Sequence, residues 1–137
     1  MKRIAAIFLG LTLAASIGFA QSAKNYVEVL YFHGAQRCIT CNAIEKHTKE
    51  LIEANYAKEI KDGSLVFKVV DISKKENEKT ADKYKVTFSS LFVSVNKDGK
   101  ETTDNMTKFG FSTARFKSDE FKAGIKKKID ESLKAVK

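Results

Sequence analysis

Apolar residues in this chain occur in short runs and at helical spacing, separated by charged stretches, and this pattern predicts an α/β domain. Residues 26–32 are aromatic, β-branched or aliphatic with a single charge, which predicts a strand that is buried in a sheet. After Cys41, the apolar residues Ile44, Leu51 and Ile52 recur at helical spacing while charged residues fill the opposite face. We therefore expect a helix of several turns there.

A second apolar run at residues 65–72 follows the turn signal at residues 62–64. Because this run is nearly continuous, it is typical of a central strand. A strand, a helix and a second strand of these lengths predict a parallel crossover unit. Residues 73–84 are highly charged, and we expect a short exposed helix there, capped by Ser73.

The remaining pattern predicts a hairpin and a final helix. Residues 88–95 form a third strand, and the turn at residues 96–100 leads into a short fourth strand at residues 101–104, antiparallel to the third. Ser118 and the two acidic residues after it predict the capped start of the last helix. The apolar stripe of that helix, which should pack on the sheet, consists of Phe121, Ile125, Ile129 and Leu133.

The first residues of the chain have the pattern of a secretory signal peptide. Lys2 and Arg3 precede an apolar stretch at residues 4–17, and the small residues Gly18 and Ala20 fit the cleavage rule. The alternative is an uncleaved membrane anchor, although the stretch is short for a bilayer span of about 20 residues. We expect an exported protein with a periplasmic or other extracytoplasmic location.

Cleavage would divide the chain into a signal peptide, residues 1–20, and one domain, residues 21–137, that begins at Gln21. The formal charge of +8 then falls to +6, from 23 basic and 17 acidic residues. The lysines are interleaved with acidic residues, and the densest group, at residues 126–128, falls on a predicted helix surface. No aromatic-basic stacking pattern accompanies them, so we expect no nucleic-acid binding. We also expect a monomer with no stable membrane insertion after cleavage.

The two cysteines of the chain form the motif Cys38-Ile39-Thr40-Cys41, between the first predicted strand and the helix after it. Unpaired N–H groups in the first turn of a helix favour an anion such as a thiolate. The leading interpretation is a redox dithiol, with Cys38 as the nucleophile, Cys41 as the resolving thiol and no cofactor besides their disulfide. A purely stabilising disulfide is the alternative, but so short a loop removes little entropy from the unfolded chain.

Three neighbours could support this chemistry. Arg37 places a cation beside Cys38 and could lower its pKa, Thr40 could offer its hydroxyl to the same sulfur, and His33 could exchange protons with the pair. Each residue also has a structural explanation: a solvated loop charge, a helix-start preference and a polar strand end. We expect a protein or small-molecule disulfide or thiol as the redox partner.

A second class of function is a binding module. Two thiolates with His33 nearby could hold a soft metal or metalloid such as copper or arsenic. A structural zinc site normally needs four protein ligands, and two cysteines and two histidines without finger-like spacing do not predict one.

The order βαβαββα, with the cysteine motif after the first strand, resembles the thioredoxin-like superfamily over residues 25–136. This resemblance implies an α/β thioredoxin-like fold: a four-stranded mixed sheet flanked by helices, with the strand before the motif in the centre. Residues 83–93 are similar to the stretch in which the family places a cis-proline before the third strand. This chain contains no proline, and Ser89 or Ser90 is nearest that position, so the substrate loop is altered.

More narrowly, Tyr31-Phe32-His33-Gly34 followed by Arg37-Cys38-Ile39-Thr40-Cys41 resembles small exported bacterial proteins known as ArsF-like subunits of a nitrophenyl-compound nitroreductase. This resemblance implies that the protein delivers electrons to a partner reductase subunit that reduces nitroaromatic compounds.

Overall fold

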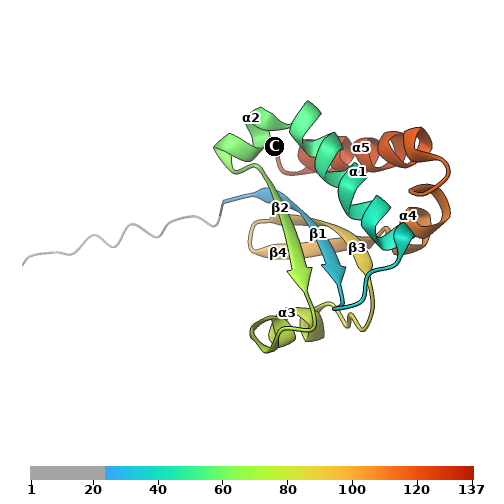
Figure 1. Ribbon diagram of the computed structural model, residues 1–137. Coiled ribbons are helices and arrows are strands. Elements are labelled where there is room, and N and C mark those ends of the chain that lie inside the picture. Colours follow the sequence, from blue (N-terminus) through green and yellow to red (C-terminus); the bar gives the residue numbers. More distant parts are fainter. Residues whose placement is uncertain (1–23) are drawn as a thin grey trace, which may run out of the picture.

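A four-stranded mixed sheet is the framework of the computed structural model, which describes residues 24–137. The strand order is β2-β1-β3-β4 (Figure 1). Strand β1 (Tyr26–His33) is parallel to β2 (Leu65–Asp71) and antiparallel to β3 (Ser90–Lys97), which pairs antiparallel with β4 (Lys100–Asn105). The expected α/β class, the central first strand and the parallel crossover are confirmed. The predicted signal peptide lies outside the described residues.

Helices cover the two faces of this sheet unequally. Helices α1 (Ile39–Asn55) and α5 (Ser118–Ala135) lie on one face, and α3 (Glu78–Lys83) lies on the other (Figure 1). Two short helices, α2 (Ala57–Asp62) and α4 (Thr107–Thr113), join the first group and were not expected from the sequence. In the part of the chain that the structure describes, no helix is both long enough and apolar enough to span a membrane.

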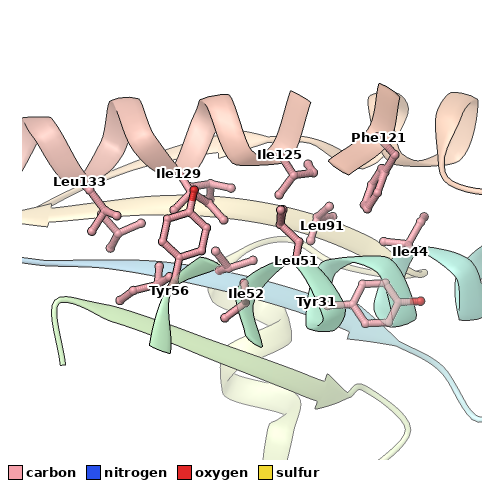
Figure 2. Packing of buried hydrophobic residues seen from close by; sticks show 14 of the residues in the cluster. Tyr31, Ile44, Leu51, Ile52, Tyr56, Leu91, Phe121, Ile125, Ile129 and Leu133 are labelled. Carbon is pink, nitrogen blue, oxygen red and sulfur yellow. The ribbon is translucent and has the colours of Figure 1, made fainter. Parts of the chain in front are cut away.

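Side chains of β1 alternate between two apolar clusters. Val27, Val29 and Tyr31 belong to the larger cluster beneath α1 and α5, whereas Leu30 and Phe32 belong to the smaller one beside α3. The predicted stripe of the last helix is confirmed, since its members are buried in the larger cluster (Figure 2): Phe121, Ile125, Ile129 and Leu133. Full burial of one such side chain contributes about 1.5–3 kcal/mol, so this interface fixes α5 on the sheet.

Two predicted element starts are shifted. β3 begins at Ser90 and not at residue 88, because Phe88 lies in the preceding loop with 62% of its surface exposed. Helix α5 begins at Ser118 itself, and Lys117 occupies the N-cap position without a side-chain hydrogen bond. The acidic residues after Ser118 still lie in the first turn, where their negative charges interact favourably with the positive end of the helix dipole.

The predicted helix cap at Ser73 is wrong. The chain first forms a short 3₁₀ helix, η1 (Lys75–Asn77), and α3 follows it. The Ser73 hydroxyl instead donates to Asp71 Oδ1 at 2.6 Å, and the Ser73 N–H donates to the same oxygen at 3.0 Å. Aspartate commonly binds the backbone two residues ahead in this way, which closes a turn at the end of a strand. Both hydrogen bonds lower the pKa of Asp71, the hydroxyl bond most.

We expect Ser73→Ala to raise the pKa of Asp71 toward its ordinary value, because the largest cause of its lowering is removed. A carboxyl group with a lowered folded pKa stabilises the fold above its unfolded pKa of about 3.9, and this contribution is lost as the pH falls through the folded pKa. The variant should therefore lose stability near neutral pH and lose less on acidification. NMR titration of Asp71 and urea unfolding across this range measure both effects.

Asp62 and Ser64 provide a matched control for this prediction. The Ser64 hydroxyl and N–H donate to Asp62 Oδ1 at 2.6 and 2.8 Å in the same arrangement. The Asp62 titration should be unchanged in Ser73→Ala and should shift in Ser64→Ala. An Asp71 titration that does not move in Ser73→Ala would contradict the role of this hydroxyl.

Candidate functional site

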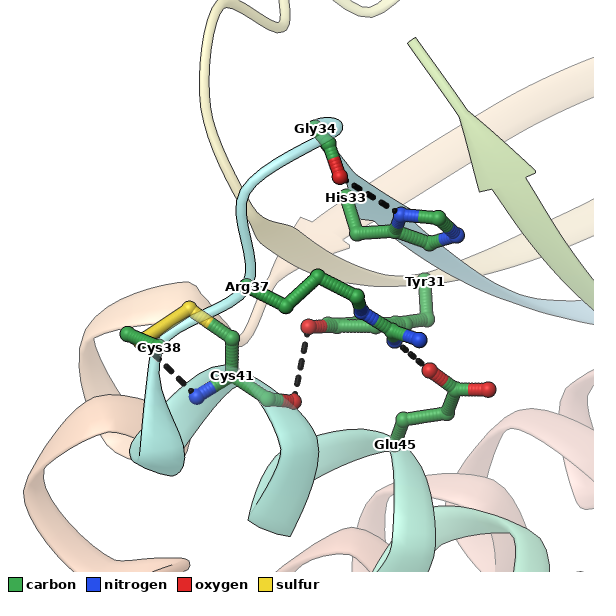
Figure 3. The surroundings of a disulfide bond; sticks show 7 residues. All are labelled: Tyr31, His33, Gly34, Arg37, Cys38, Cys41 and Glu45. Atoms are coloured by element: carbon green, nitrogen blue, oxygen red, sulfur yellow. Dashed lines mark hydrogen bonds and ion pairs between the residues drawn. A yellow bond between two sulfur atoms is a disulfide. The ribbon is translucent and has the colours of Figure 1, made fainter. Parts of the chain in front are cut away.

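The two cysteines meet at the start of α1, where they form a disulfide with their Cα atoms 5.0 Å apart (Figure 3). Cys38 is the N-cap residue of the helix, and its sulfur accepts a hydrogen bond from the Cys41 N–H at 3.0 Å. The two cysteines differ in exposure, since Cys38 is exposed and Cys41 is only 6% exposed. A partner molecule can therefore reach Cys38 first.

The local backbone explains why a sulfur occupies this position. Strand β1 ends at His33, a short loop follows, and α1 begins at Ile39. Cys38 has extended dihedral angles (φ −76°, ψ 162°), which are typical of an N-cap residue whose side chain turns back over the first turn. The N–H groups of that turn and the helix dipole favour a thiolate at Cys38 once the disulfide is reduced.

Tyr31 is a buried part of the site, whereas the sequence pattern predicted only a strand residue within the motif Tyr31-Phe32-His33-Gly34. Its side chain is fully buried in β1, and its hydroxyl donates to the Cys41 carbonyl at 2.7 Å (Figure 3). A buried tyrosine hydroxyl generally requires a partner, so a tyrosine within an apolar strand was the available signal. This hydrogen bond ties the first turn of α1 to the central strand.

Arg37 is close to the cysteines in sequence, but its charged group is directed elsewhere. The guanidinium forms an ion pair with Glu45 of α1, on the side away from the disulfide (Figure 3). Its Cζ lies 5.9 Å from the centroid of the Tyr31 ring. Sequence reasoning missed Glu45, although a residue four positions after Cys41 lies on the same face of a helix as Cys41.

His33 and Thr40 occupy the edges of the site. The His33 Nδ1–H donates to the Gly34 carbonyl at 2.9 Å, and the His33 ring centroid lies 6.2 Å from that of Tyr31. Thr40 is the second residue of α1 and is half-buried. These contacts do not test the proton-transfer role of His33 or the hydroxyl role of Thr40, and both stay predictions.

Glu28, the single carboxylate of the first strand, lies on the other face of the sheet. It is 6% exposed and pairs with Lys68 at 2.6 Å. Because side chains alternate along a strand, Glu28 shares the face of Leu30 and Phe32, opposite the one on which α1 packs. The Tyr31 hydroxyl, in contrast, lies on the face of the sheet that the cysteine helix covers.

A cavity of about 400 Å³ opens beside the sulfurs. It lies beyond the carboxyl ends of β1 and β2, where ligands commonly bind in open α/β sheets. Its lining contains no acidic or basic side chain and comes from four separate parts of the chain: Gly34, Gln36, Cys38, Cys41, Ile72, Thr87, Phe88, Ser89 and Phe111. A larger groove of about 560 Å³ lies between α1, α2 and β2, and none of its lining residues is a cysteine.

Three exposed apolar residues lie next to Cys38 in the chain or line the same cavity. Ile39 beside Cys38 is 67% exposed, and the cavity residues Phe88 and Phe111 are 62% and 39% exposed. We call these three residues the apolar rim. Large apolar groups at the surface commonly mark a place where another molecule docks.

The two serines predicted as a substrate loop occupy different positions in the structure. Ser89 lines the cavity with both cysteines, whereas Ser90 is the first residue of β3 and donates its hydroxyl to the Phe88 carbonyl at 2.9 Å. All peptide bonds between the described residues are trans. The segment that faces the sulfurs, Thr87 to Ser89, is therefore a proline-free loop with its own apolar residue.

Within residues 24–137, no group of three or more histidine, cysteine, aspartate or glutamate side chains is placed to hold a metal ion. The two thiols of the metal-binding alternative thus have no third ligand of these types beside them in this conformation.

The fold is thioredoxin-like, as the central β1, the strand order and the cysteine pair at the start of α1 show. No protein-family model and no curated protein sequence matches the chain. Three solved structures are similar to it. Thioredoxin-2, a component of the malaria parasite protein secretion machinery, has 22% identity and a TM-score of 0.47, over 76% of this chain and 84% of its own.

The second similar structure is a thioredoxin from Thermus thermophilus, with 17% identity and a TM-score of 0.48, over 77% of this chain and 72% of its own. The third is a malarial protein with 22% identity and a TM-score of 0.45, over 74% of this chain and 96% of its own.

We expect limiting iodoacetamide to modify Cys38 of the reduced protein before Cys41, because Cys38 is exposed at the helix start and Cys41 is 6% exposed. Mass spectrometry of the separated peptides measures the order of labelling. Labelling in denaturant provides the control, since unfolding should make the two rates similar. Equal rates in the folded protein would contradict the assignment of Cys38 as the accessible thiol.

Proposed function

We propose that this protein is an exported thiol-disulfide oxidoreductase that acts through Cys38 and Cys41. The observation that carries the proposal is the difference between the two sulfurs at one helix start: Cys38 is exposed and Cys41 is buried behind it. A disulfide that only stabilised the fold would gain little from so short a loop. An accessible disulfide next to an open cavity suits exchange with another molecule.

The reaction follows from these positions. In the reduced protein, the Cys38 thiolate attacks one sulfur of a substrate disulfide; a Cys38–substrate disulfide forms, the substrate disulfide breaks, and the departing thiolate takes up a proton. Cys41 then loses its proton and attacks Cys38, which forms the Cys38–Cys41 disulfide and releases the second substrate thiol. Two electrons and two protons pass to the substrate. A thiol or a reductase partner must then reduce the protein disulfide again.

The apolar rim favours a polypeptide as the disulfide substrate. Ile39, Phe88 and Phe111 present apolar surface beside an uncharged cavity, and a flexible peptide segment could cover them during exchange. A small disulfide would contact only part of this surface. Proteins are therefore the preferred substrates in this proposal, and small disulfides react through the sulfurs alone.

Export and the identity of the partner rest on the sequence. Lys2, Arg3 and the apolar stretch after them support export, and an oxidising compartment is where such a dithiol would meet disulfides. The resemblance of residues 31–34 and 37–41 to ArsF-like proteins supports electron delivery to a partner reductase of nitroaromatic compounds. In that case the partner subunit carries out the reduction and the dithiol supplies the electrons.

We expect the reduced protein to cleave insulin disulfides and Cys38→Ser to lower this activity to the background rate, because the remaining thiol, Cys41, is buried. Cys41→Ser should complete the first exchange and accumulate a mixed disulfide, since the resolving thiol is missing. A turbidity assay and non-reducing electrophoresis measure these outcomes, and a trapped mixed disulfide identifies the partner. Activity that persists in Cys38→Ser would contradict the assignment of Cys38 as the attacking thiol. A potential below about −300 mV without substrate reduction would indicate a structural disulfide.

The apolar rim predicts a second difference. Phe88→Ser should lower kcat/KM for a polypeptide disulfide several-fold, up to about tenfold, because about 1.4 kcal/mol of lost contact corresponds to a factor of ten. The rate of Phe88→Ser with a small aromatic disulfide should stay within about twofold of the parent rate, because a small substrate loses little contact free energy. Phe116→Ser is the matched control, since Phe116 is 79% exposed and does not line the cavity. Equal losses in both variants would contradict docking at the rim.

A further inference from the structure

We propose that Glu45 is a positioning residue that sets the acidity of the Cys38 thiol by holding the Arg37 guanidinium. The proposal rests on the proposed function, because it concerns how readily the same dithiol gives up electrons. It starts from one observation: the basic residue that directly precedes Cys38 does not face the sulfurs but forms an ion pair with Glu45 (Figure 3).

Three contacts hold this arrangement in place. Glu45 lies one helical turn after Cys41 in α1, and the side chains of Arg37 and Glu45 are 30% and 26% exposed. The guanidinium Cζ is 5.9 Å from the Tyr31 ring centroid, so the arginine side chain lies against the ring. The Tyr31 hydroxyl in turn donates to the Cys41 carbonyl at 2.7 Å. The ion pair is therefore connected to the helix turn that carries the disulfide.

Few other charges contact the sulfurs and their surroundings. The residues that line the cavity together with the two cysteines have uncharged side chains. Tyr31 contributes a neutral hydroxyl from β1. His33 at the end of β1 is paired with the Gly34 carbonyl, and Asp71 at the end of β2 accepts from Ser73. Arg37 and Glu45 are consequently the ion pair that is connected most directly to the thiols.

The sign of the effect follows from the charges. Arg37 paired with Glu45 has no net charge and attracts a Cys38 thiolate weakly, whereas an unpaired Arg37 would attract it strongly. A thiolate belongs only to the reduced protein, so its stabilisation favours the reduced protein and makes the disulfide more oxidising. By neutralising Arg37, Glu45 keeps the Cys38 pKa higher and makes the dithiol a better electron donor.

The test is the Cys38 pKa in Glu45→Gln, which removes the acidic charge and keeps the shape of the side chain. Whether Arg37 stays in place or turns, the net charge beside Cys38 rises by one. We expect the acid dissociation constant of Cys38 to increase about three- to tenfold, a pKa shift of about half to one unit. Thiolate ultraviolet absorbance and iodoacetamide rates across the pH range measure it without any substrate.

A double variant shows whether the effect passes through Arg37. In the double variant Arg37→Gln with Glu45→Gln, the acid dissociation constant of Cys38 should return to within about twofold of the parent value. The reason is that neither residue 37 nor residue 45 then carries a charge. Glu53→Gln, the same change in an exposed residue two turns further along α1, should leave the pKa unchanged. Equilibration with glutathione should show a more oxidising Glu45→Gln couple, by up to about 30 mV per tenfold change.

An unchanged Cys38 pKa in Glu45→Gln would overturn the proposal, and so would a lowered pKa that persists in the double variant. These outcomes are independent of insulin reduction. If the parent protein reduced no substrate but Glu45→Gln still shifted the pKa, the proposed function would fail and the ion-pair effect would stand.

Discussion

Burial of β1 on both faces is the constraint on which the rest of the structure depends. Residues 27–32 are all buried, and both edges of the strand pair with neighbours, β2 on one side and β3 on the other. Successive side chains of the strand therefore alternate between the two apolar clusters. Helix α1 must pack on one of these cores to cover Val27, Val29 and Tyr31, and its first turn is then fixed above the carboxyl end of the strand.

The site uses this fixed end of β1 in two ways. Tyr31, the last buried residue of the strand on the face that α1 covers, donates its hydroxyl to the Cys41 carbonyl, so the buried cysteine is anchored to the sheet. Cys38 is one turn earlier, at the N-cap, where the chain emerges from the loop and the residue is exposed. The same helix start thus holds one thiol inside and presents the other, which is the asymmetry that exchange between disulfides requires.

The electrostatics of the site depend on which charges the fold brings together. Arg37 is next to Cys38 in the chain, and adjacency alone suggests that it stabilises the thiolate. Folding places Glu45 within reach of the guanidinium and directs that charge along the Tyr31 ring. A cation adjacent in sequence has become half of a neutral pair, so the acidity of the thiol depends on α1 as much as on the loop.

The sequence by itself determined the strands, the two long helices and the position of the cysteine pair, because alternation, helical repeats and turn residues are local signals. It did not reveal α2 or α4, since helices of six and seven residues are too short to show a clear repeat. It also misplaced the cap at Ser73, whose hydroxyl binds Asp71 instead. Only the tertiary structure decided that Tyr31, Glu45, Phe88 and Phe111 belong to the site, because contacts between separate elements depend on how those elements pack.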